Sequence, residues 1–148
     1  MFNDTIKMTG RLTVKRFGQN GDLLEERDIP NLVVTAGKTH IASKLVGYTG
    51  SSANVMTHMA VGTSATASAV ANTTLGAEIA RSAFSSSPTV SSTTVTYSAS
   101  FTGLTANITE AGIFNAASNG TMLCRTTFAL IPAVSTDTIV ISWNVSVG

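Results

Sequence analysis

The chain has 148 residues, a mass of 15.3 kDa, a formal net charge of +1 and a single cysteine. A chain of this size forms one domain that buries roughly two-thirds of the surface exposed by its unfolded form. One cysteine excludes an internal disulfide framework, and the near-neutral charge, without a basic run interleaved with aromatic residues, disfavours nucleic-acid binding. No stretch approaches the roughly 20 apolar residues of a membrane span, and the first residues contain no apolar segment typical of a secretory signal. We therefore expect a single soluble domain over residues 1–148, made in the cytoplasm.

A charged β-hairpin is predicted for residues 1–30. Residues 6–17 alternate between apolar and polar, and residues 22–29 form the return strand. The Gly-Gln-Asn-Gly loop at 18–21 between them supplies glycines for the turn. Pro30 is expected to end the return strand. Because most charged residues of the chain lie in its first third, this hairpin is expected to face water.

One helix is predicted, over residues 35–46. Thr35 is a suitable N-cap, and Gly47 supplies the left-handed conformation that commonly ends a helix. Four apolar residues recur at helical spacing and are expected to face the core: Ile41, Ala42, Leu45 and Val46. A helix of about three turns cannot cover a sheet of several strands, so we expect it at one end or flank of a β core.

The remaining chain, residues 55–148, is expected to supply the strands of a sandwich. Segment 63–74 is small and polar and is expected to be a flexible surface loop. Asn119-Gly120 is a strong signal for a tight turn between two strands. Besides the two clearest strands described next, strands are expected over 55–62, 108–116 and 121–131. Segment 76–84 fits either a helical turn or a strand, and the strand is favoured.

Two segments, 94–102 and 138–147, alternate strictly between apolar and polar residues, which excludes a helix. Their apolar faces are expected to form the core: Tyr97, Phe101, Ile139, Ile141, Trp143 and Val145. About eight strands with one helix and no alternation of strands and helices indicate an all-β fold. We predict an antiparallel β-sandwich, jelly-roll-like, with one short α-helix.

The carboxyl-terminal half is almost without charge. From Phe84 to Gly148 the only acidic or basic residues are Glu110, Arg125 and Asp137, and Ser and Thr fill the polar positions of the strands. Burying a hydroxyl that keeps a hydrogen-bond partner costs little, whereas Lys or Glu loses several kcal/mol of hydration unless it is paired. Outer strand faces of this kind are typical of surfaces covered by other protein. This pattern favours an assembly protein over an enzyme.

No catalytic or metal-binding constellation emerges from the sequence. His40 and His58, the only histidines, have no acid or thiol at metal-ligand spacing. A Ser–His–Asp triad lacks a nucleophile elbow and a Gly-rich oxyanion segment. Glu25, Glu26 and Asp28 lie in the charged hairpin and indicate a solvated face rather than paired catalytic carboxylates. We therefore predict no enzymatic activity, no metal and no cofactor.

Glu110 is an acid in the middle of an uncharged sheet region. An isolated buried carboxylate is costly, so its side chain must either reach the surface or pair. Arg125 lies on the following strand at a similar distance from the Asn119-Gly120 turn. We predict an intrachain Glu110–Arg125 ion pair, with Arg81 as the competing partner. Cys124, beside Arg125 in an apolar strand, is expected to be a small buried hydrophobe.

Five short blocks carry a resemblance to a known class of proteins: residues 31–42 (NLVVTAGKTHIA), 56–63 (MTHMAVGT), 74–81 (TLGAEIAR), 109–116 (TEAGIFNA) and 122–126 (MLCRT). Together they resemble small structural proteins of tailed bacteriophages, especially the capsid cement, or decoration, proteins of short-tailed phages. The resemblance implies a jelly-roll-like subunit that self-associates as a dimer or trimer and binds the major capsid protein on the outside of the head. It also implies a place in the virion, at the capsid surface, after synthesis in the host cytoplasm.

Two alternatives stay open. An acid followed by Gly-Ile-Phe and a turn also occurs in tail-collar and tail-fibre proteins, so a tail-collar, tail-fibre or baseplate component is the main one. A carbohydrate-binding or adhesin module is disfavoured, because such modules expose aromatic residues and Trp143 and Tyr97 fall on apolar strand faces. For a decoration protein, capsid contacts are expected at the charged hairpin or the 63–74 loop. Self-association is expected on the neutral strand faces.

Overall fold

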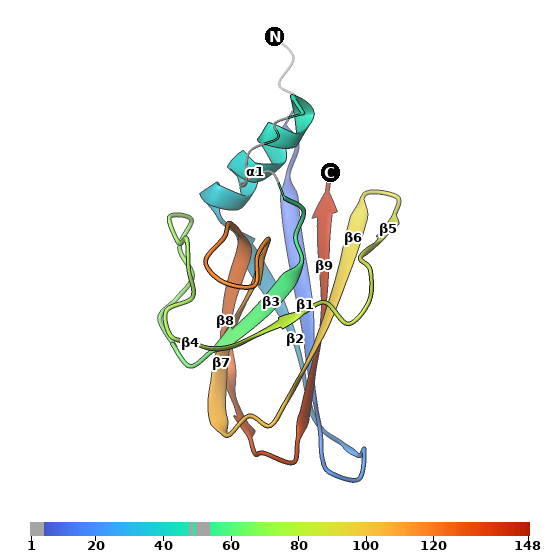
Figure 1. The fold of residues 1–148 in the computed structure, drawn as a ribbon, viewed down its shortest axis with the longest axis vertical. Coiled ribbons are helices and arrows are strands. Elements are labelled where there is room, and N and C mark those ends of the chain that lie inside the picture. Colours follow the sequence, from blue (N-terminus) through green and yellow to red (C-terminus); the bar gives the residue numbers. More distant parts are fainter. Residues whose placement is uncertain (1–4, 48, 50–53) are drawn as a thin grey trace.

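The computed structural model describes residues 5–47, 49 and 54–148, and within them the chain forms one helix and nine strands (Figure 1). In chain order these are β1 (Met8–Phe17), β2 (Leu23–Val33), α1 (Thr35–Leu45), β3 (His58–Gly62), β4 (Glu78–Ala83), β5 (Thr89–Ser91), β6 (Thr94–Thr102), β7 (Ala106–Phe114), β8 (Met122–Ala133) and β9 (Thr138–Val147). Within this described part, no helix has the length and hydropathy needed to cross a membrane.

The strands form a single curled antiparallel sheet in the order β4-β3-β7-β8-β2-β1-β9-β6-β5. The curl brings β4, at one end of this order, against β6, where the Ser85 N–H donates to the Ser98 carbonyl at 2.8 Å. The two halves of the sheet meet at β2, which pairs along β1 but reaches β8 only through Leu32 and Val33. The predicted all-β antiparallel fold is confirmed. The jelly-roll form is not identified by this order, because the nine strands make one continuous series rather than two separate four-stranded sheets.

The amino-terminal hairpin is an integral part of the sheet. β1 lies between β2 and β9 and pairs with β9 along its whole length, from Met8 to Phe17. Leu12 and Val14 on its inner face are fully buried. The hairpin therefore carries charge on its outer face and contributes to the core on its inner one. Only its turn and the start of β2 project from the body of the sheet (Figure 1).

Pro30 does not end β2, which continues to Val33 and corrects the prediction. Proline lacks a backbone N–H and is tolerated where a strand has no neighbour to receive one. Before Leu32, the side of β2 away from β1 has no ladder to β8. The Pro30 carbonyl instead accepts a hydrogen bond from the Thr126 hydroxyl at 2.9 Å.

Helix α1 lies at one end of the sheet, as predicted (Figure 1). Its N-cap is Val34 rather than Thr35, and no side chain caps it. The Val34 N–H donates to the carbonyl of Leu123 on β8, so contact with the sheet replaces a side-chain cap. Gly47, with φ of +64°, adopts the predicted left-handed conformation after the helix.

The buried side of α1 agrees with the predicted apolar stripe only at Ile41, which packs against the core. Ala42 is exposed, and Leu45 and Val46 are 87% and 82% exposed, whereas Gly37 and His40 are buried. Glycine at position 37 lets the helix approach β8 closely, because a Cβ there would collide with the carbonyl oxygen of Leu123. Close backbone packing at Gly37, together with the contact of Ile41 with the core, orients this helix.

Five of the six predicted core residues are buried: Phe101, Ile139, Ile141, Trp143 and Val145. Tyr97 is the exception, because it is only partly buried and packs at the margin of the core. Its ring lies 5.1 Å from the ring of Phe84, centroid to centroid. Tyr97 sits near the end of the sheet at which α1 lies, where the opposing strands no longer cover it completely.

Candidate functional site

Glu110 on β7 and Arg125 on β8 form an ion pair in the protein interior. Arg125 Nη2 and Nε lie 2.8 and 3.0 Å from Glu110 Oε2. The side chains are 2% exposed for Arg125 and 0% exposed for Glu110. The strand register places Glu110 opposite Thr127 and Arg125 opposite Gly112, so the pair runs diagonally across the two strands. The structure thus contains the predicted pair in a diagonal rather than a directly opposed arrangement.

The Glu110 carboxylate also forms hydrogen bonds with both ends of the segment that connects β3 and β4. It accepts hydrogen bonds from the backbone N–H groups of Ser64 at 3.3 Å, Gly76 at 2.9 Å and Ala77 at 2.7 Å. Burial by itself raises the pKa of this carboxyl, but the hydrogen bonds from Gly76, Ala77, Arg125 and Ser64 lower the pKa by more. Glu110 is therefore ionised at neutral pH.

The Arg125 guanidinium holds the middle of the same loop. It donates to the carbonyls of Thr66 at 3.0 Å and Ala67 at 3.4 Å, and to Asn72 Oδ1 at 3.0 Å. Asn72 Oδ1 in turn accepts the Ala69 N–H at 2.8 Å. The loop 63–74 lies at the surface, as expected, and the buried ion pair binds it at Ser64, Thr66, Ala67 and Asn72, a more restrained arrangement than the predicted flexible loop.

Arg81, the competing partner, is committed elsewhere. Its guanidinium lies 3.8 Å from the centre of the Phe114 ring and pairs with Glu78 at 2.7 Å. It also donates to the carbonyls of Ala116 at 3.0 Å and Asn119 at 2.8 Å. Arg81 therefore supports the β7–β8 turn.

A second ionic cluster was missed by the sequence analysis. Arg16 Nη1 lies 3.1 Å from Asp137 Oδ2, and Arg16 Nε lies 3.6 Å from Glu25, which also pairs with Arg27. The Asp137 side chain is 3% exposed and that of Glu25 is 16% exposed, so Glu25 does not belong to a solvated face. Like Glu110, Asp137 is a lone acid in an uncharged segment, so the same reasoning could have predicted that it has an ionic partner.

The histidines and the cysteine lie on three different elements, α1, β3 and β8. His40 is buried on α1, and His58 Nδ1 lies 2.8 Å from the Thr57 hydroxyl. Among the described residues, no three His, Cys, Asp or Glu side chains lie close enough to hold a metal ion. Cys124 is buried, and this burial raises the pKa of its thiol.

The outward side of β6 and β9 is a continuous surface without a charged side chain, here called the neutral face. The strands pair in register, so their polar residues lie opposite one another. Thr94 and Ser146 share a hydrogen bond of 2.7 Å, and the Thr96 hydroxyl donates to Asn144 Oδ1 at 2.8 Å. The neutral face comprises Thr94, Thr96, Ser98, Ser100 and Thr102 of β6 with Thr138, Val140, Ser142, Asn144 and Ser146 of β9.

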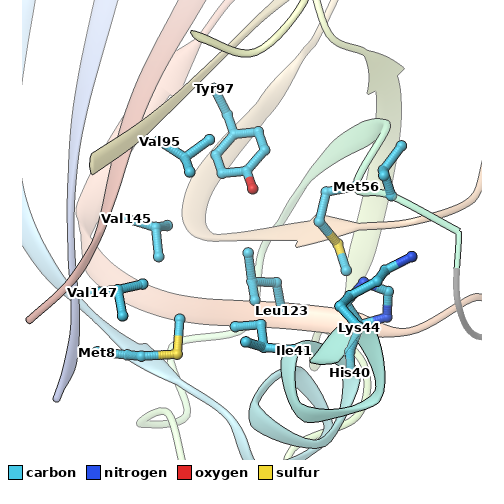
Figure 2. A pocket seen from close by; sticks show the side chains of 11 residues that line it. Met8, His40, Ile41, Lys44, Met56, Val95, Tyr97, Leu123, Val145 and Val147 are labelled. Carbon is cyan, nitrogen blue, oxygen red and sulfur yellow. The ribbon is translucent and has the colours of Figure 1, made fainter. Parts of the chain in front are cut away.

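A hollow of about 340 Å³, here called the apolar groove, opens between α1 and the inner side of the sheet (Figure 2). Its lining is mostly aliphatic, with the amino group of Lys44, the ring of His40 and the hydroxyl of Tyr97 as polar parts (Figure 2). An adjacent hollow of about 290 Å³ shares Val55, Met56 and Tyr97 with it. The groove is lined by Met8, His40, Ile41, Lys44, Val55, Met56, Val95, Tyr97, Leu123, Val145 and Val147.

Comparison of the chain with protein-family models, with curated proteins and with solved structures found no match. The function must therefore be argued from the surfaces just described. The loop 63–74, the neutral face and the apolar groove all have few or no charged side chains. Depletion of charge is typical of surfaces that contact other molecules.

Proposed function

We propose that this chain is a virion structural protein, a capsid decoration subunit that binds the outside of the major capsid lattice of a tailed bacteriophage and stabilises the head. The observation that carries the proposal is the neutral face. Its side chains carry no charge, and two of its cross-strand pairs, Thr94–Ser146 and Thr96–Asn144, are joined by side-chain hydrogen bonds. The neutral face supports an assembly protein in general, and the resemblance of the five sequence blocks to cement proteins supports a capsid decoration subunit in particular.

Covering the neutral face costs little free energy. A hydroxyl that already has a partner keeps its hydrogen bond when water is removed, whereas an unpaired ammonium or carboxylate loses its hydration. Arg11 and Lys15 on the neighbouring strand β1 mark where charge begins. We assign self-association, as a dimer or trimer, to the neutral face.

We assign contact with the major capsid protein to the loop 63–74. Its exposed side chains are small or apolar and include Ala65, Ala71 and the half-exposed Val70. Because the Glu110–Arg125 pair already fixes the loop, little conformational entropy remains to be lost on binding. Each contact need be only modest, since many copies on one shell act together.

Immunogold labelling tests the location. Antibodies raised against the purified protein are applied to virions of the phage whose genome encodes it, and the label is located by electron microscopy. Label spread over the whole head supports the decoration role. Label confined to one vertex would assign the chain to the tail, the alternative that the Glu-Ala-Gly-Ile-Phe hairpin keeps open. Virions without label would overturn both.

A lysine placed on the neutral face tests self-association. Ser142 lies opposite Ser98 in this face, and Ser142→Lys would have to bury an unpaired ammonium in any contact made there. We expect the variant to keep its circular dichroism spectrum and to sediment as a smaller species than the wild type. Ser135→Lys, at an exposed position in the loop between β8 and β9, is the matched control outside the face and should sediment like the wild type. Equal sedimentation of Ser142→Lys and the wild type would remove self-association from this face.

A further inference from the structure

Apolar side chains at and beside the apolar groove are exposed to solvent. Val55, which lines it, is 67% exposed, and Leu45, next to the lining residue Lys44, is 87% exposed. Exposed apolar side chains beside an apolar hollow are a feature of interaction sites. The groove therefore calls for an occupant with apolar side chains.

The charge of the groove lining is basic. Lys44 is the one lysine or arginine among the lining residues, and no aspartate or glutamate lines the groove. Among the described residues, Lys44 belongs to none of the ion pairs. An occupant should accordingly carry a negative charge beside its apolar groups.

The turn of the amino-terminal hairpin has this composition. Leu23 and Leu24 are 50% and 51% exposed, and they follow Asp22. Nearby Arg16 and Arg27 are engaged by Glu25 and Asp137, whereas Asp22 takes part in none of the ion pairs of the described residues. Residues 18–24, here called the hairpin tip, thus combine two exposed leucines with an uncompensated carboxylate.

The hairpin tip and the apolar groove lie at opposite ends of the molecule. β1 starts at Met8, which lines the groove, and ends at Phe17, immediately before the tip. A ten-residue strand is about 34 Å long at roughly 3.4 Å per residue, so a tip cannot reach the groove of its own chain. Figure 1 shows α1 and the hairpin turn at the two ends of the long axis.

We propose that the hairpin tip of one copy docks in the apolar groove of a second copy, with Leu23 and Leu24 against its aliphatic lining and Asp22 beside its Lys44. Such a contact is head-to-tail and uses different surfaces on the two partners, so repetition gives a ring if the rotation closes and a filament if it does not. This contact extends the proposed function. It depends on the proposed function in one respect only, that copies of the chain self-associate. It adds a second contact to that at the neutral face.

Charge reversal on each side tests the contact in sedimentation velocity runs at low ionic strength. We expect Asp22→Lys and Lys44→Glu each to raise the Kd of self-association about tenfold, because an attraction becomes a repulsion. An equimolar mixture of the two variants should associate more tightly than either alone, because the acidic groove of Lys44→Glu receives the basic tip of Asp22→Lys. Lys38→Glu, a reversal on the same helix outside the groove lining, is the matched control and should behave as the wild type.

A mixture that associates no better than the single variants would overturn the head-to-tail contact. Native mass spectrometry that finds an apolar small molecule bound to each purified chain would also overturn it, by assigning the groove to a ligand. Both results are independent of the immunogold experiment, in which the decoration role is decided on virions. A failure of the contact and a failure of the proposed function are thereby distinguishable.

Discussion

Arg125→Met is expected to be among the most damaging single substitutions in this protein. The arginine makes two hydrogen bonds to Glu110 and three to the loop, through Thr66, Ala67 and Asn72. Methionine fills much of the same volume but leaves a buried carboxylate without its counter-charge. Breaking a buried pair in this way costs about 3–5 kcal/mol of the free energy of unfolding, a large share of the roughly 5–15 kcal/mol typical of a domain.

Urea unfolding followed by the fluorescence of Trp143 measures this cost. Arg11→Met is the matched control, because Arg11 forms an equally close pair with Asp28, at 2.7 Å, but with side chains 61% and 50% exposed. The control should lower the free energy of unfolding far less, since exposed ion pairs are screened by water. If Arg125→Met costs no more than Arg11→Met, burial does not make the Glu110–Arg125 pair more important to the fold than an exposed pair.

The pH dependence gives an independent test of the same pair. The pKa of Glu110 is lower in the folded chain than in the unfolded one, so the carboxylate contributes stability above the unfolded pKa of roughly 4.3, and that stability is lost as the pH falls through the folded value. Glu110→Gln removes this contribution and places an amide N–H₂ against backbone N–H donors. We expect the variant to be less stable than the wild type at neutral pH and to lose less stability below pH ~4.3. Parallel acid unfolding curves for the two proteins would contradict the assigned pKa shift.

Three further predictions concern packing. Trp143→Ala should lower the free energy of unfolding by about 3–5 kcal/mol in urea, because the side chain is fully buried, and a loss under 1 kcal/mol would exclude Trp143 from the core. Gly37→Ala should lower the melting temperature in calorimetry, because a Cβ there meets the Leu123 carbonyl, whereas Ala42→Gly on the exposed side of α1 should show only the smaller helix-propensity effect. The Cys124 thiol should react with a disulfide reagent in urea but not in buffer, because it is buried and its pKa is raised, and reaction in buffer at the denatured rate would refute its burial.

Periodicity in the sequence was enough to predict the strands that have one buried and one exposed side. Residues 94–102 and 138–147 coincide with β6 and β9, and five of their six predicted core residues are buried. The Glu110–Arg125 pair was predictable for a related reason, since a lone acid on an uncharged strand needs a partner and the turn at Asn119-Gly120 limits the choice. β5 was missed because it has only three residues, too few to establish a period, and all three are exposed.

Tertiary structure decided what depends on residues distant in the sequence. The side of α1 that packs on the sheet follows from the approach of Gly37 to the backbone of Leu123, a contact without an apolar pattern. Arg125 reaches Thr66 and Asn72, far away in the chain, and so turns an apparently flexible loop into a fixed one. Alternation of apolar and polar residues shows which side of a strand is buried, because successive side chains always point to opposite faces of the sheet. The position of a helix, a loop or a groove depends on which strands become neighbours, and only the folded chain determines that.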